Sequence, residues 1–244
     1  MSEIHLRQIK SHLQKTFNGL IDLSDYQNKS ATDRELIFLT RSLAAFALMV
    51  TANISPQEAS KSIVDGGQDN GIDSIYFDRR EKVMYVLQSK WKQNSRGGIK
   101  TDEVMKFTKG FRDLISARYE RFNSKLSNKI QDIQELLNDA GTRFEVILVY
   151  SGQTSLADEP KREIDDLLSE MNDPIDIVNM RIFNQSNIYN IISQGAAGSP
   201  INLEVCLFEW GQTKEPYQSY YGQVSASEVL IGGLSITLNY SLQI

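Results

Sequence analysis

Three polar side chains stand in two strand-like runs that are separated by a short charged turn. The first run, residues 72–78, contains Asp73, and the second, residues 83–91, contains Gln88 and Lys90. A carboxylate and an amide oxygen are hard ligands that suit Mg²⁺ or Mn²⁺. A nearby ammonium can orient or deprotonate water and stabilise a developing oxyanion. Together these groups fit the hydrolysis of a phosphodiester.

The two runs bring these side chains to one face of a sheet if they form a hairpin. In the register that pairs Asp78 with Val83, Asp73 is opposite Gln88, and Lys90 lies two residues further along the same face. A slip of one residue would separate the set. Each residue also has a simpler interpretation. Asp73 could be an acid that closes a turn, Gln88 a polar strand residue, and Lys90 a surface lysine with a buried stem. The hairpin alone leaves both interpretations open.

Helices and strands alternate around this hairpin. Helices are predicted over residues 3–20, 31–50, 55–64, 101–117 and onward to 138, 159–171 and 186–193, and further strands over 144–151, 177–183 and 201–208. Thr32 and Ser55 are the expected N-caps of the second and third helices. The run FEVILVYS, residues 144–151, is continuously apolar and typical of a strand buried on both faces.

This order predicts an α/β fold, in which N-terminal helices precede the hairpin and a central mixed sheet has helices on both faces. Residues 1–210 would form this domain. Residues 211–244 show no sustained period and are expected to be a C-terminal extension.

The charge of the chain is uneven. The net charge is −5, yet between Arg79 and Arg112 there are ten basic residues and three acidic ones. Such a stretch either contacts a phosphate backbone or forms an ordinary solvated face. If it binds nucleic acid, the expected contacts are Lys92, Arg96, Lys100 and Lys106.

Several other chemistries lack the residues they need. The two histidines, His5 and His12, lie in the peripheral N-terminal segment, which disfavours histidine-centred zinc sites and Ser/His/Asp triads. The single cysteine, Cys206, is expected to be a buried thiol. The segment DGGQDNGID lacks the Gly-Lys-Ser/Thr of a P-loop, and its acids at positions 65, 69 and 73 miss the EF-hand spacing. The sequence shows no secretory signal and no membrane span, so a cytoplasmic protein is expected.

Two strings resemble the signature of PD-(D/E)xK nucleases. They are DNGIDSI, residues 69–75, and LQSKW, residues 87–91, in the variant with glutamine before x-Lys that Mrr-like restriction endonucleases have. The order of helix, Asp strand, QxK strand, helix and apolar strand is matched over residues 31–151. The organisation is most similar to the N-terminal part of abortive-infection phage-resistance (AIPR) proteins. Those proteins are much longer, and glutamine here replaces the commoner acid, which lowers the ligand charge.

The resemblance implies a restriction-endonuclease-like fold and a metal-dependent endonuclease that cuts DNA in defence against phage. It implies that Asp73 and Gln88 hold Mg²⁺ or Mn²⁺ and that Lys90 is catalytic. An acid on a preceding helix often contributes in this family, with Glu35 as the first candidate and Glu58 as the second. The extension over residues 211–244 would begin a second domain and either pack on the core or mediate a homodimer. The alternative is a catalytically inactive module of the same fold that binds nucleic acid or a protein partner.

Overall fold

The computed structural model describes residues 3–93, 97–194, 206–215 and 218–225. The chain divides into two compact units, residues 1–192 and 193–244. The first unit contains the hairpin and every described residue of the expected site. Its boundary falls at residue 192, whereas the sequence pattern placed the end of the domain at residue 210.

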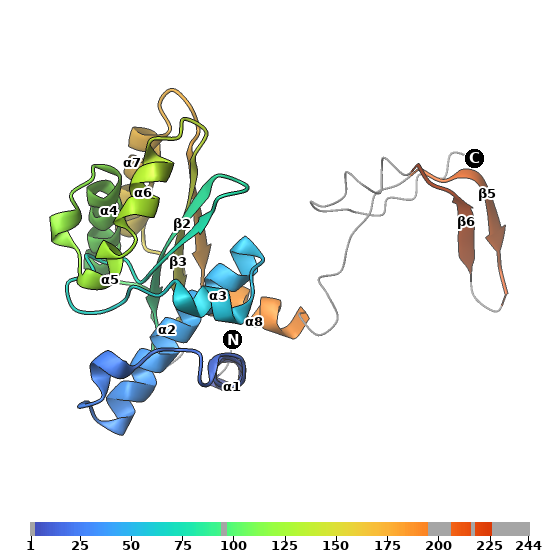
Figure 1. The fold of residues 1–244 in the computed structure, drawn as a ribbon. Coiled ribbons are helices and arrows are strands. Elements are labelled where there is room, and N and C mark those ends of the chain that lie inside the picture. Colours follow the sequence, from blue (N-terminus) through green and yellow to red (C-terminus); the bar gives the residue numbers. More distant parts are fainter. Residues whose placement is uncertain (1–2, 94–96, 195–205, 216–217, 226–244) are drawn as a thin grey trace. The chain divides into compact units, whose positions relative to one another are not determined.

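A four-stranded mixed sheet lies at the centre of the first unit (Figure 1). The strands, in order across the sheet, are β1 (Ser74–Asp78), β2 (Val83–Lys90), β3 (Arg143–Tyr150) and β4 (Val178–Phe183). The pair β1–β2 is an antiparallel hairpin, whereas β2–β3 and β3–β4 are parallel. Parallel neighbours need crossover connections, and helices supply them here. The expected α/β fold with a mixed sheet is confirmed.

The hairpin has the register expected from the sequence. Asp78 pairs with Val83, and the pairing continues to Ser74 and Leu87. Beyond the end of β1, the backbone N–H of Asp73 still donates to the Leu87 carbonyl, at 2.8 Å. Asp73 therefore stands at the end of the hairpin, opposite the residue that follows Leu87.

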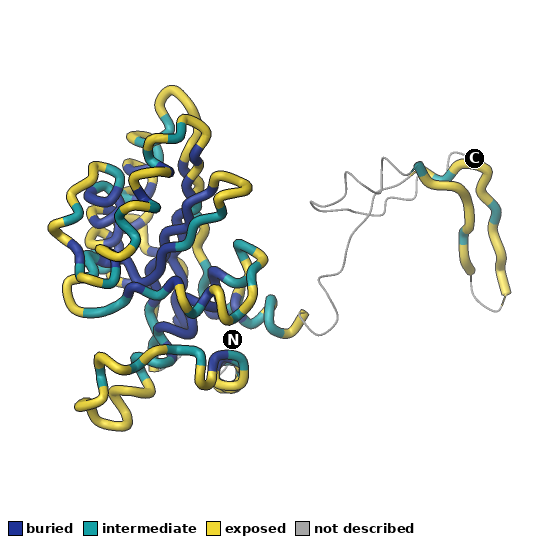
Figure 2. Tube along the Cα trace, viewed as in Figure 1, coloured by how far each residue is buried: buried dark blue, intermediate teal, exposed yellow. Residues whose placement is uncertain are grey.

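Helices cover both faces of the sheet (Figure 1). One face carries α1 (Glu3–Phe17), α2 (Ala31–Ala52), α3 (Pro56–Lys61) and α8 (Gln185–Gln194), and the other carries α4 (Thr101–Ile115), α5 (Ser124–Ser127), α6 (Ile130–Leu137) and α7 (Asp158–Met171). Two 3₁₀ turns connect helices: η1 (Ser24–Tyr26) lies between α1 and α2, and η2 (Tyr119–Arg121) lies between α4 and α5. Each face of the sheet has its own hydrophobic core, called here the α4 core and the α2 core after the helices that cover them. Along β2, Met84 and Val86 lie in the α4 core, while Tyr85 and Leu87 lie in the α2 core. The middle strands are consequently buried on both sides (Figure 2).

Helix α2 crosses the sheet as a core element. Its N-cap is Ser30, whose hydroxyl accepts the Asp33 N–H at 3.1 Å, and not Thr32 as the sequence pattern indicated. By length and composition α2 could cross a membrane, which the sequence analysis overlooked, but 50% of its most apolar window is buried inside this protein. Packing against β2 and β3 accounts for that apolar character. Ser55 and Pro56 begin α3 as expected.

The second unit contains an antiparallel pair, β5 (Phe208–Thr213) and β6 (Ser219–Gln223), with an irregular register between Phe208 and Gly211. The strand expected over residues 201–208 falls mostly outside the described residues, and β5 begins where that strand was expected to end. Cys206 is exposed, which corrects the expectation of a buried thiol. Residues 226–244 lie outside the described part of the chain.

Candidate metal site

Three carboxylates converge where the chain enters the hairpin. Asp65 and Asp69 lie in the loop between α3 and β1, and Asp73 ends that loop. One oxygen from each lies within 4.8 Å of the others. Asp73 is buried, and the side chains of Asp65 and Asp69 are only 18% and 12% exposed. Oxygens at this separation can be spanned by one divalent cation, because cation–oxygen bonds are about 2.0–2.6 Å long. The three carboxylates could therefore hold a metal ion.

Backbone hydrogen bonds fold this loop back on itself. The N–H of Asp65 donates to the carbonyl of Asp73 at 3.0 Å, so the first and last acids are held side by side. Between them the chain passes through the left-handed region at Gln68, Asn70 and Gly71, where φ is 59°, 53° and 82°. Such backbone angles reverse the chain within a few residues, and this reversal brings the three side chains to one place.

Helix α4 supports the middle of the loop. Gly110 of α4 lies so close that a Cβ there would come within 2.0 Å of the Asn70 carbonyl oxygen. A Cβ on Gly71 would likewise come within 3.0 Å of the Lys106 backbone. The Asn70 amide donates to Asp113 Oδ2 at 3.0 Å. Two close backbone contacts and one side-chain hydrogen bond thus fix the loop on the helix.

One oxygen of each carboxylate is held by protein donors. Arg41 Nε donates to Asp65 at 2.7 Å. The Gly71 N–H and Lys106 Nζ donate to Asp69 at 2.8 Å each. The Ser89 N–H and hydroxyl donate to Asp73 at 2.7 and 2.9 Å. Among the described residues, no protein donor binds the other oxygen of any of the three. The bound oxygens orient the carboxylates, and the remaining oxygens are available to a ligand.

Arg41 of α2 positions the first acid. Its side chain is 1% exposed, and it donates to both the carboxylate and the carbonyl of Asp65, at 2.7 and 2.8 Å. Its other donors bind the Asp25 carboxylate, at 2.9 and 2.7 Å, and the Asp22 carbonyl. Burial alone would lower the pKa of Arg41, but its hydrogen bonds to Asp25 and Asp65 raise that pKa, so the guanidinium stays charged. Every N–H of this planar fork is used, which leaves Asp65 little orientational freedom.

The electrostatics of Asp73 favour a bound cation. Burial raises the pKa of Asp73 to about 7, and the negative charge of Asp65 adds to the rise. The ammonium of Lys90 and the N–H of Ser89 act in the opposite direction. A divalent cation between the carboxylates would relieve the same repulsion and hold Asp73 in its ionised form.

Strand β2 supplies two further polar groups. Gln88 directly follows Leu87 and therefore stands opposite Asp73. Gln88 is 1% exposed, and its side-chain oxygen has no hydrogen-bond partner within the described residues. A buried amide oxygen without a donor is costly, and it is also a suitable cation ligand. Lys90 is half-buried and lowers the pKa of Asp73. In the described part of the chain its ammonium forms no hydrogen bond or ion pair. The structure therefore places Asp73, Gln88 and Lys90 at one end of the hairpin.

The two helical acids considered from the sequence are not part of this group. Glu35 Oε1 accepts from Lys10 Nζ at 2.8 Å and from Gln14 at 3.2 Å, on the α1 side of α2. Glu58 closes the capping box of α3 with Ser55. Their side chains are engaged in local structure, and the loop acids stand in the cluster instead.

Asp65 and Asp69 were not predicted from the sequence as members of the site. Their signal was the acid spacing of DGGQDNGID, which was compared only with the EF-hand pattern. Arg41 gave no signal, because an arginine in an apolar helix does not reveal which acids it will meet.

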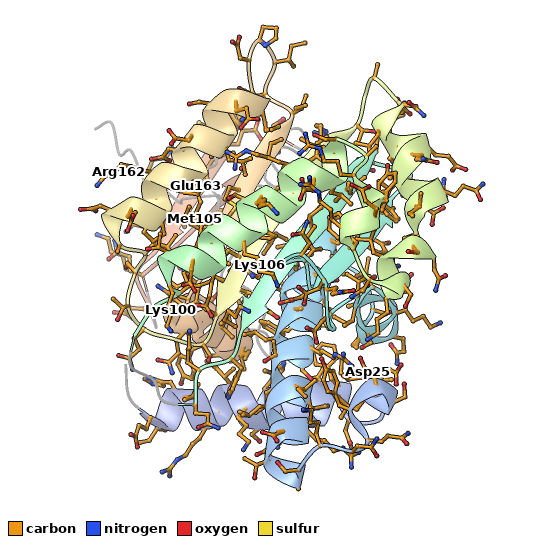
Figure 3. The ribbon with its side chains drawn as sticks, turned by 90° about the vertical axis from the view of Figure 1, so that its left-hand side faces the viewer. Asp25, Lys100, Met105, Lys106, Arg162 and Glu163 are labelled. Atoms are coloured by element: carbon orange, nitrogen blue, oxygen red, sulfur yellow. The ribbon has the colours of Figure 1, made fainter. Side chains whose placement is uncertain are left out.

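The basic residues expected to contact nucleic acid have different surroundings. Lys106 binds Asp69, and Lys92 lies 3.3 Å from Glu103. Lys100 is exposed at the start of α4, and Figure 3 shows it together with Lys106 on this side of the molecule. Arg96 lies outside the described residues.

No family model matches the chain, and neither a curated protein nor a solved structure matches it. The activity must therefore be inferred from the geometry and chemistry of the site, together with the sequence resemblance.

Proposed function

We propose that the chain is a divalent-metal-dependent endonuclease that hydrolyses DNA phosphodiester bonds. The convergence of Asp65, Asp69 and Asp73 next to Gln88 and Lys90 carries this proposal. Carboxylate and amide oxygens are typical ligands of Mg²⁺ and Mn²⁺ and lack the nitrogen and sulfur atoms that zinc favours. When bound, the cation would neutralise phosphate charge and activate water.

The protein groups have distinct tasks in this proposal. The three carboxylates hold the cation, and the unpartnered oxygen of Gln88 completes the ligand set. Lys90 donates a hydrogen bond to the attacking water or to a phosphate oxygen, and so stabilises the negative charge that develops there. Its ammonium is available for this task, since no described residue forms a hydrogen bond or an ion pair with it.

The surroundings of the site favour nucleic acid as the substrate. Lys106 already binds one of the three acids, and Lys100 is exposed at the start of the same helix. A phosphate backbone that follows the start of α4 would meet these ammonium groups on its way to the carboxylates. We take DNA as the substrate because of the resemblance to PD-(D/E)xK nucleases.

The same resemblance suggests the biological role. Asp73, Gln88 and Lys90 occupy the positions of the QxK signature, and the organisation of the chain is similar to the N-terminal part of AIPR proteins. We therefore infer a role in bacterial defence against phage, exercised in the cytoplasm.

Plasmid nicking and metal binding test this function together. Supercoiled plasmid is incubated with the full chain and Mg²⁺ or Mn²⁺, and Mn²⁺ binding is measured by calorimetry. Asp73→Asn and Asp65→Asn should lose both metal binding and nicking, because each removes one charged ligand. Lys90→Ala should retain metal binding and lose turnover by orders of magnitude. Asp166→Asn, at an exposed position of α7, is the matched control and should behave as the parent protein.

Two outcomes would reject the proposal. Full nicking by a folded Asp73→Asn protein would remove the site from the reaction. Tight DNA binding without cleavage at any divalent cation would instead identify an inactive module of the same fold.

A further inference from the structure

A cavity lies between α1 and α2, apart from the carboxylate cluster. The cavity has a volume of about 300 Å³. Leu6, Leu36 and Leu39 form the apolar part of its lining, Arg7, Lys10 and Glu35 form the charged part, and Trp91 is its aromatic residue. None of these residues takes part in the carboxylate cluster.

The lining combines an aromatic side chain with two cationic residues and one acid. Trp91 is half-buried against the α2 core, so one part of its indole is held and another part faces the cavity. Among the described residues, no acid or acceptor binds the Arg7 guanidinium. Lys10 is paired with Glu35 across the rim. An aromatic wall and a free guanidinium suit a ligand with a planar ring and an anionic group, which is the chemistry of a nucleotide.

Two elements, β2 and α2, contribute residues both to the cavity or its border and to the candidate metal site. Trp91 directly follows Lys90, and the two side chains go to opposite sides of the sheet, since Trp91 packs in the α2 core. On α2, Leu36 lines the cavity and Arg41 holds Asp65, with a rise of about 8 Å along the helix axis between them. Both places therefore adjoin the end of β2, the cavity through Trp91 and the metal site through Gln88 and Lys90.

We propose that this cavity binds an unpaired nucleotide of the strand whose phosphodiester lies at the carboxylates. The inference rests on the proposed function and adds a substrate class to it, namely single strands or duplexes with unpaired ends. A base inside a duplex is stacked on both faces, so an indole in a cavity can stack only on a base that has left the helix. The base lies on Trp91, and the phosphate of the same nucleotide binds Arg7.

Tryptophan fluorescence tests the proposal directly. The chain has two tryptophans, so Trp210→Phe leaves Trp91 as the single reporter, and Trp210 lies in the other compact unit. The probe is a single-stranded oligothymidylate of about twelve nucleotides, a length that one binding domain can cover, in buffer with chelator to prevent cleavage. It should quench Trp91, whereas a blunt duplex and free thymidine monophosphate at equal nucleotide concentration should not.

Substitutions then separate stacking from charge. Trp91→Ala should raise the Kd for the single strand by about tenfold to a hundredfold, and Trp91→Phe, which keeps a ring, should raise it less. Arg7→Ala should reduce the slope of log K against log salt by about 0.7, the single-strand value for one lost phosphate contact. Arg162→Ala is the control, because Arg162 projects from α7 into solvent (Figure 3) and should leave the slope unchanged.

The outcomes distinguish this inference from the proposed function. Quenching that persists in Asp73→Asn, together with loss of cleavage, supports both. Quenching by the parent protein without cleavage under any condition retains the nucleotide site and rejects the nuclease. Absence of quenching, or equal quenching by duplex or by free monophosphate, overturns the assignment of the cavity to an unpaired nucleotide.

Discussion

Gly110→Ala should damage the metal site from a distance, through the backbone of the loop. The added Cβ would lie 2.0 Å from the Asn70 carbonyl oxygen, whereas such contacts are essentially never shorter than 3.0 Å. The loop must therefore move away from α4 by about 1 Å, which far exceeds the ~0.2 Å within which cation–ligand distances are held. Asn70 directly follows Asp69, so the displacement falls on a carboxylate of the cluster.

We expect Mn²⁺ affinity to fall by about tenfold to a hundredfold, as when a supporting contact of a metal site is lost. Alanine favours helix over glycine by about 1 kcal/mol, so any loss of thermal stability would come from the clash and not from helix propensity. Gly67→Ala in the same loop is the control, since a Cβ there meets nothing within 4 Å. Calorimetry with Mn²⁺ and thermal unfolding would be measured on both variants. A Gly110→Ala protein with parental affinity and parental Tm would refute the described packing of the loop.

Three further predictions concern single groups of the site. Arg41→Lys should weaken Mn²⁺ binding in the parent protein but have no further effect when Asp65→Asn is already present, because Arg41 acts through Asp65. A double-mutant cycle measured by calorimetry tests this, and additive losses of Mn²⁺ affinity would contradict it. Gln88→Glu should tighten Mn²⁺ binding by adding a charged ligand, and an unchanged Kd would mean that the side chain does not reach the cation. For Asp73, the pKa is raised in the folded state from 3.8 to about 7, so stability without metal should fall as pH rises from about 4 to 7 and then level off. The neutral Asp73→Asn protein should not show this fall in chemical denaturation, and Mn²⁺ affinity of the parent protein should rise with pH up to about 7, because the cation needs the ionised acid.

The hairpin was predictable from the sequence because its information is local. A short charged turn between two strand-like runs allows few pairings, and the structure has the expected register that joins Asp78 to Val83. The same reasoning identified β3 as a central strand, since a continuous apolar run must be covered on both faces. Strand geometry then predicted that Asp73, Gln88 and Lys90 share one face, whereas their expected roles came from the resemblance to PD-(D/E)xK nucleases.

The remaining site could not be predicted, because long-range contacts create it. Asp65 and Asp69 reach Asp73 only through left-handed turns in the loop and the close approach of Gly110, which is distant in sequence. In the family that the chain resembles, an acid on a preceding helix often contributes, but here the candidate Glu35 forms an ion pair with Lys10 of α1. Charge patterns report which residues can ionise, whereas tertiary packing decides which of them meet.

The metal site joins residues of a paired strand to residues of an irregular loop. Gln88 belongs to a strand that is paired on both sides. Its backbone N–H should therefore exchange with deuterium only when the whole unit opens. Asp65 and Asp69 belong to an irregular loop that carries fewer backbone hydrogen bonds and should exchange earlier. Half of the expected ligands are therefore held by strand pairing, and the other half by Arg41 and by the packing of the loop on α4. Bonds from oxygen to Ca²⁺ are longer than bonds to Mg²⁺, so Ca²⁺ should bind only by displacing the loop acids from the strand, with lower affinity and without supporting turnover.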